Sequence, residues 1–170
     1  MLNGQIFISY RRDDTCHLAG RIYDRLRERF PKSKIFYDID TLRAGEDFVE
    51  AIKKSVGFCD AFIAIIGKGW LDSSDEKGRR IDNPDDFVRL EISAALERDI
   101  QIIPVLGDGA AMPKSNQLPP ELERLARILA IEISYSRFES DSEQQGCYQR
   151  KLGRFGKCYL TSRECFRRQF

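Results

Sequence analysis

Apolar residues occur along the chain either in short continuous runs or at every third or fourth position of longer segments. A continuous run such as AFIAII at 61–66 is typical of a strand buried on both faces, whereas the spaced pattern is typical of a helix that buries one side. Segments 41–48 and 68–86 are polar and contain glycine, which predicts loops. The pattern predicts strands at 5–10, 33–40, 60–67, 100–106 and 130–134, and helices at 17–30, 48–59, 83–99 and 121–129.

This alternation of strands and helices predicts an α/β fold: a flavodoxin-like, three-layer arrangement with a five-stranded parallel sheet and helices on both faces. In such sheets, ligands bind beyond the carboxyl ends of the strands. The side chains expected at that edge are those of Tyr10, Arg11, Arg12, Asp38, Asp40, Lys68 and Trp70.

The predicted helix in NPDDFVRLEISAALERD carries a carboxylate on its apolar side. At about 100° per residue, Glu91 lies about 40° from Phe87 and falls within the apolar arc of the helix. An ionised carboxylate in that position needs a charged partner or a ligand. Arg98 or another basic residue is the expected partner if Glu91 is structural. Asn83 is expected to be the N-cap of this helix.

Composition narrows the classes of function. The 170 residues include 28 Lys and Arg against 27 Asp and Glu, a balance that favours neither nucleic acid nor an anionic membrane as a partner. There is no apolar run long enough to span a membrane and no signal-peptide pattern, so the expected location is cytoplasmic. Five cysteines without a CxxC pair and a single histidine, His17, predict neither a disulfide scaffold nor a metal site.

The composition changes near residue 140. We expect one domain at 1–140 and a basic, cysteine-containing tail at 141–170, which holds seven Lys and Arg against three Asp and Glu and lacks a regular period. Poor order is the expectation for this tail, and contact with nucleic acid is the less favoured alternative.

The chemistry expected at the sheet edge is that of a dinucleotide site. The chain has no GxGxxG and no GxxxxGK[ST] motif, and the third strand does not end in the aspartate of a phospho-accepting receiver domain. Arginines suit phosphates, aromatic rings suit a flat base, and a desolvated carboxylate suits a sugar whose glycosidic bond breaks. Simpler interpretations remain open: Arg11 and Arg12 as surface charges paired with Asp13 and Asp14, and Trp70 as part of the core.

At these positions the sequence resembles the Toll/interleukin-1 receptor (TIR) domain family, particularly its bacterial members, from about residue 5 to 134. The resemblance lies in IFISYRRDD, FYDIDTLRAGEDFVEAI, AFIAIIGKGWL and IIPVLGDGAAMPKSNQLPPELERLA, in that order. Some members cleave NAD+ at the nicotinamide–ribose bond, using a glutamate four residues after an aromatic side chain that is usually Trp. FVRLE supplies Phe87 and Glu91 at this spacing, with Phe in place of Trp.

The resemblance implies an NAD+ nucleosidase or ADP-ribosyl cyclase that is active when self-assembled, with Glu91 as the catalytic residue, NAD+ as the substrate and no cofactor. The expected products are nicotinamide and either ADP-ribose or a cyclic ADP-ribose isomer. A role in bacterial immune signalling or antiphage cell death, and a fused or separate sensor domain as a partner, follow from the same resemblance. The implied substrate-binding residues are Tyr10, Arg11, Arg12, Asp38, Arg43, Gly45 and Phe87; Trp70 joins them because of its place at a strand end.

The competing interpretation is a non-catalytic module that acts through homotypic TIR–TIR contacts, as a scaffold, an adaptor or a factor that interferes with host signalling. In that case segment 41–48 is a binding surface and Glu91 a partner in a structural ion pair. An inward glutamate at this spacing is not needed by an adaptor, so its presence favours the enzyme.

Overall fold

Within the residues that the computed structural model describes, 5–37 and 47–133, the sheet has five parallel strands. Its order is β2-β1-β3-β6-β7, the order of flavodoxin-like folds, and the predicted fold class is confirmed. The strands are β1 (Ile6–Ser9), β2 (Ile35–Tyr37), β3 (Ala61–Ile66), β6 (Gln101–Gly107) and β7 (Ile131–Ile133). The boundary predicted at residue 140 lies outside the described residues.

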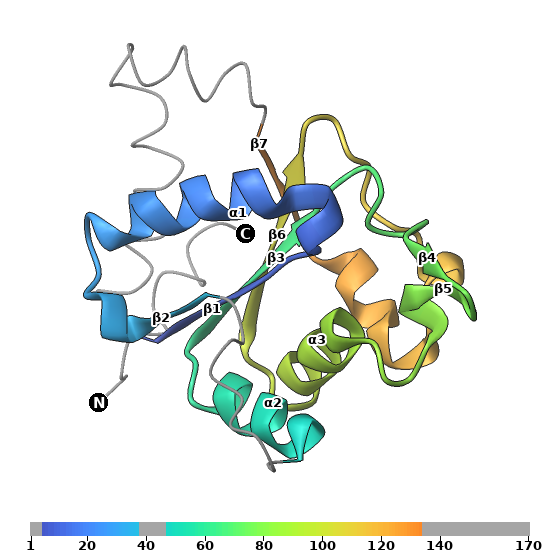
Figure 1. The fold of residues 1–170 in the computed structure, drawn as a ribbon, viewed down its shortest axis with the longest axis horizontal. Coiled ribbons are helices and arrows are strands. Elements are labelled where there is room, and N and C mark those ends of the chain that lie inside the picture. Colours follow the sequence, from blue (N-terminus) through green and yellow to red (C-terminus); the bar gives the residue numbers. More distant parts are fainter. Residues whose placement is uncertain (1–4, 38–46, 134–170) are drawn as a thin grey trace, which may run out of the picture. The chain divides into compact units, whose positions relative to one another are not determined.

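Helices cover both faces of the sheet (Figure 1). Helix α1 (Arg12–Arg27) lies on one face, and α2 (Phe48–Gly57) and α3 (Phe87–Glu97) pack together on the other. All six residues of β3 are buried, as the continuous apolar run predicted for a strand between two helical layers. The full burial of β3 agrees with its position as the middle strand of the sheet.

Two local predictions were wrong in detail. Helix α1 begins at Arg12 rather than at residue 17, and a first turn precedes a non-helical Thr15 (φ −131°). The predicted loop 68–86 contains a small antiparallel hairpin, β4 (Ser74–Asp75) with β5 (Gly78–Arg79). The helix predicted at 121–129 is confirmed as a 3₁₀ helix, Pro120–Arg127.

The 3₁₀ form of this segment is visible in its hydrogen bonds. The backbone N–H of Leu122 donates to the Pro119 carbonyl, an i to i+3 hydrogen bond. Leu122 and Leu125 are three residues apart and both fully buried, and a helix with three residues per turn places such side chains on one side. Residues three apart also share a face of an α-helix, so the sequence predicts a helix here without fixing its type.

Cys59 packs at the end of α2 as a small buried residue. It is 7% exposed, and its thiol donates to the Ser55 carbonyl over 3.2 Å. Burial, with a smaller contribution from the charge of Asp60, raises the pKa of this thiol to about 12.

We expect Cys59 to resist alkylation in the native protein. A thiol with a pKa near 12 is ionised at pH 8 to an extent about a thousandfold smaller than an ordinary thiol, and the thiolate is the species that reacts. Peptide mass spectrometry after iodoacetamide treatment should therefore show Cys59 labelled about a thousandfold more slowly in the native protein than in urea, and more slowly than partly exposed Cys16 in the native protein. Equal native rates would contradict the burial of this thiol.

Candidate functional site

The strand order reverses between β1 and β3, since β2 lies on the other side of β1. A crevice at the carboxyl ends of these two strands is the usual ligand site of such sheets. Tyr10, Arg11 and Arg12 follow β1, and Trp70 follows β3, so these four predicted site residues lie around this reversal.

Glu91 is buried on α3, with 6% of its surface exposed. Its neighbours along the helix, Ile92, Ala94 and Ala95, belong to the hydrophobic core. The helical-wheel prediction that Glu91 lies on the inward side of α3 is therefore confirmed. A carboxylate in such surroundings is costly unless a polar or charged group compensates for its lost hydration.

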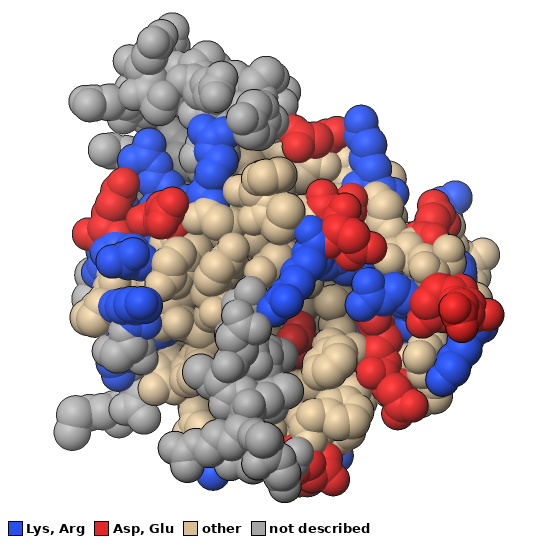
Figure 2. Space-filling model, in the orientation of Figure 1, with Lys and Arg blue, Asp and Glu red and all other residues tan. Residues whose placement is uncertain are grey.

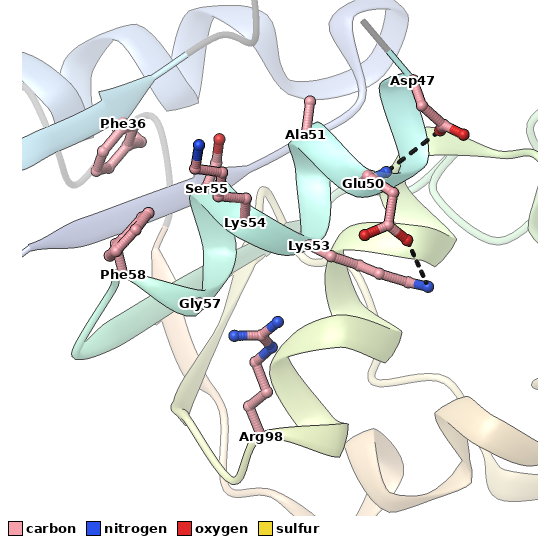
Figure 3. Close-up of a pocket in the computed structure, with 10 residues that line it drawn as sticks. All are labelled: Phe36, Asp47, Glu50, Ala51, Lys53, Lys54, Ser55, Gly57, Phe58 and Arg98. Atoms are coloured by element: carbon pink, nitrogen blue, oxygen red, sulfur yellow. Dashed lines mark hydrogen bonds and ion pairs between the residues drawn. The ribbon is translucent and has the colours of Figure 1, made fainter.

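Arg98, the structural partner considered for Glu91, lies elsewhere. Its guanidinium packs against Gly57 at the end of α2, where a Cβ at Gly57 would meet Arg98 Nη1. Figure 3 shows the Arg98 side chain directed at that end of α2. A side chain at position 57 would therefore require the Arg98 guanidinium to move.

Phe87 lies one turn before Glu91 and is 44% exposed. Its ring is 5.3 Å from the ring of Phe48, centroid to centroid, at an interplanar angle of 44°. Phe48 begins α2, so the two aromatic rings join the N-terminal ends of α2 and α3. Sequence reasoning missed Phe48, although it is the last residue of segment 41–48, which holds the predicted site residues Arg43 and Gly45. An exposed aromatic surface beside a buried carboxylate suits a flat heterocycle.

Tyr10 is half-buried and stacks on Tyr37, the last residue of β2, with ring centroids 5.4 Å apart and planes within 8°. Arg12 is exposed at the start of α1. Both residues therefore keep surface at the edge where the substrate was predicted.

Arg11 and Trp70 are instead enclosed. The Arg11 side chain has no exposed surface; its Nε donates to the Trp70 carbonyl over 2.9 Å, and its two terminal nitrogens donate to the Asp86 carboxylate over 3.0 and 3.1 Å. Trp70 is 1% exposed within the core, and its ring centroid is 5.7 Å from the guanidinium carbon of Arg11. Arg11 and Trp70 are therefore buried beneath the sheet edge, and neither has surface with which to contact a substrate in this structure.

The predicted site residues Asp38, Arg43 and Gly45 lie outside the described residues. Among the described residues, no group of three or more His, Cys, Asp or Glu side chains could hold a metal ion. In the same part of the chain, no helix has the length and apolar character needed to cross a membrane.

The N-cap of α3 is Asp86, and the assignment of Asn83 to this role was wrong. The Asp86 carboxylate accepts from the Arg89 backbone N–H over 3.1 Å, whereas Asn83 accepts from the Asp85 N–H in the preceding turn. Pro84 and that turn precede the helix, which begins at Phe87. Asp86 therefore belongs to the site. An aspartate directly before an apolar helical segment is a signal for an N-cap, and this signal could have identified it.

Further ion pairs surround the first turn of α3. The hydrogen bond from Arg79 to Asp82 lowers the pKa of the Asp82 carboxyl. Burial raises the pKa of the Glu121 carboxyl, but hydrogen bonds from its own backbone and from Arg89 outweigh this and leave it lowered. Figure 2 shows basic and acidic side chains interleaved on the side of the molecule that carries the β4–β5 hairpin.

A groove of about 660 Å³ runs along α2 and is open to solvent (Figure 3). Phe36 and Phe58 lie at one end of it, and Arg98 lies beside Gly57. The described site residues at the strand ends and on α3 do not line this groove. It is therefore separate from the edge where the predicted residues gather.

Comparison with known proteins gives consistent results. The sequence pattern of the TIR domain matches residues 6–147. The chain is 32% identical over 134 residues to the NAD(+) hydrolase tir-1 of Caenorhabditis elegans and 28% identical over 128 residues to the NAD(+) hydrolase sarm1 of Drosophila melanogaster. These matches cover 77% and 74% of this chain but only 13% and 9% of the two relatives.

Two solved structures share the fold. The TIR domains of the activated Roq1 resistosome superpose with a TM-score of 0.62 at 16% identity, covering 90% of this chain and 99% of theirs. A TIR-STING receptor from C. gigas superposes with a TM-score of 0.52 at 22% identity, covering 81% of this chain and 37% of the receptor.

Proposed function

The chain belongs to the TIR domain family, and we propose that it cleaves NAD+ at the nicotinamide–ribose bond, with Glu91 as the catalytic residue. The observation that carries the proposal is the burial of the Glu91 carboxylate one turn after the exposed ring of Phe87. The two relatives named as NAD(+) hydrolases support the choice of substrate.

The chemistry follows from the groups at the sheet edge. The C1′–N bond breaks and its electron pair leaves with nicotinamide, which departs neutral because it was a pyridinium in NAD+. No general acid is therefore required. Positive charge develops on the ribose, and a carboxylate held in a partly desolvated position stabilises that charge more strongly than one in water. The Glu91 oxygens would also accept hydrogen bonds from the ribose hydroxyls.

The second half of the reaction decides the product. Attack by water on C1′ forms a C1′–O bond, releases a proton to solvent and gives ADP-ribose. Attack by a hydroxyl of the same molecule forms a C1′–O bond and releases a proton to solvent, or attack by a ring nitrogen forms a C1′–N bond; either gives a cyclic ADP-ribose isomer. We propose hydrolysis or cyclisation of this kind in self-assembled protein, because the resemblance to the NAD+-cleaving members implies activity in the assembled state. Bacterial immune signalling is the role that the resemblance implies.

The direct test is the release of nicotinamide from NAD+ by the full chain. We expect release per protein molecule to rise with protein concentration and with a crowding agent, as chromatography of nicotinamide, ADP-ribose and cyclic products would show. Heat-denatured protein serves as the control for spontaneous hydrolysis. If assembled protein released no nicotinamide, the result would overturn the proposal and favour a non-catalytic TIR–TIR interaction module.

A further inference from the structure

The buried ion pair between Arg11 and Asp86 joins two elements that are far apart in the sequence. Arg11 follows β1, and Asp86 precedes α3. Their side chains are 0% and 2% exposed, and the two guanidinium nitrogens face the two carboxylate oxygens at 3.0 and 3.1 Å. This is the bidentate geometry that gives an arginine–carboxylate pair its directional specificity.

The Asp86 carboxylate that pairs with Arg11 also caps α3 and lies near a second arginine. Its Oδ2 accepts the Arg89 N–H and so caps α3, while Oδ1 lies 3.5 Å from Arg80 Nε. Arg80 in turn lies 3.5 Å from Asp13, so two arginines and two aspartates form one network. The first turn of α3 is therefore held against the end of β1 through a single carboxylate.

Glu91 lies five residues after Asp86 on the same helix, about 7.5 Å along the axis at 1.5 Å per residue. A shift of the first turn is therefore transmitted to the Glu91 carboxylate. Displacing a catalytic group by about 1 Å can reduce a rate about a hundredfold. A buried ion pair is seldom more stable than well-packed apolar residues of similar volume, so its value here lies in fixing one geometry.

We infer that Arg11 is a positioning residue that acts through Asp86 to fix the helix carrying Glu91, and that its exposed neighbour Arg12 is the arginine that contacts the substrate. The inference rests on the proposed catalytic role of Glu91. It assigns different tasks to two adjacent arginines that the sequence could not distinguish.

Two conservative variants test this assignment. Arg11→Lys keeps the positive charge but loses the bidentate fork, and Asp86→Asn keeps an N-capping side chain but loses the charge. For both we expect kcat for nicotinamide release to fall about 10- to 100-fold with KM within twofold, because the catalytic group is misplaced while the binding surface is unchanged. For Arg12→Ala we expect a raised KM with little change in kcat. Arg25→Lys, on the exposed side of α1, is the matched control for an Arg-to-Lys change.

Amide hydrogen exchange gives a readout that does not depend on activity. We expect the amides of residues 89–91 to exchange at least tenfold faster in Arg11→Lys and Asp86→Asn, while the amides of β3 keep their protection. A raised KM at unchanged kcat in Arg11→Lys would overturn the inference by making Arg11 a substrate ligand, and so would unchanged exchange in α3. If the wild-type chain released no nicotinamide, the proposed function would fail, and the exchange measurement would still decide whether the ion pair holds α3.

Discussion

Replacing Glu91 with glutamine is expected to reduce nicotinamide release by about 10²- to 10³-fold, the loss typical of removing one group that stabilises developing charge. Glutamine has nearly the same shape and can still accept a hydrogen bond, but it lacks the negative charge that opposes the cation-like ribose. The side chain is buried, at 6% exposure, and the similar shape of glutamine should leave the packing around it unchanged. Chromatography would measure the loss of nicotinamide release, and circular dichroism would show that the variant is folded.

Glu97 provides the matched control for this substitution. It is exposed at the end of the same helix, so Glu97→Gln removes the same charge from α3 without changing the buried side of the helix. We expect this variant to retain the wild-type rate. Nicotinamide release at the wild-type rate from both Glu91→Gln and Glu91→Ala would exclude Glu91 as the catalytic residue and leave the inward carboxylate with a structural role.

The position of Glu91 was predictable because it depends on local geometry alone. Within α3 the angle between two side chains is fixed by the helical period, so Phe87 and Glu91 had to lie on the same face. The sheet was predictable for a related reason: the uniformly apolar β3 requires a helical layer on each face, and the alternation of elements then leaves few topologies.

The partners of the charged side chains were not predictable, because they depend on tertiary geometry. Arg11 and Asp86 are 75 positions apart, and the sequence offered Asp13 and Asp14 as nearer partners for Arg11. In the structure, Asp14 accepts the Gly69 N–H over 3.1 Å, and Asp13 lies near Arg80. Period and composition do not contain that information.

The surroundings of the apolar side chain of Trp70 were also not predictable from the sequence. Trp70 follows β3, and a side chain at the end of a strand can either line a substrate pocket or pack into the core. The structure places the ring in the core at 1% exposure, beneath the Arg11 guanidinium. This placement leads to a prediction that separates the two roles by measurement.

Trp70→Ala is expected to lower the free energy of unfolding by about 3 to 5 kcal/mol, the usual cost of truncating a buried aromatic side chain. The cavity would also remove the surface on which the Arg11 guanidinium lies. Because Trp70 is the only tryptophan in the chain, urea unfolding should be followed by circular dichroism rather than by fluorescence. Leu129→Ala, which truncates a side chain 94% exposed, should stay within about 0.5 kcal/mol of the wild type. If Trp70→Ala instead kept its stability and only raised KM for NAD+, the ring would border the substrate, and the packing around Arg11 would not depend on it.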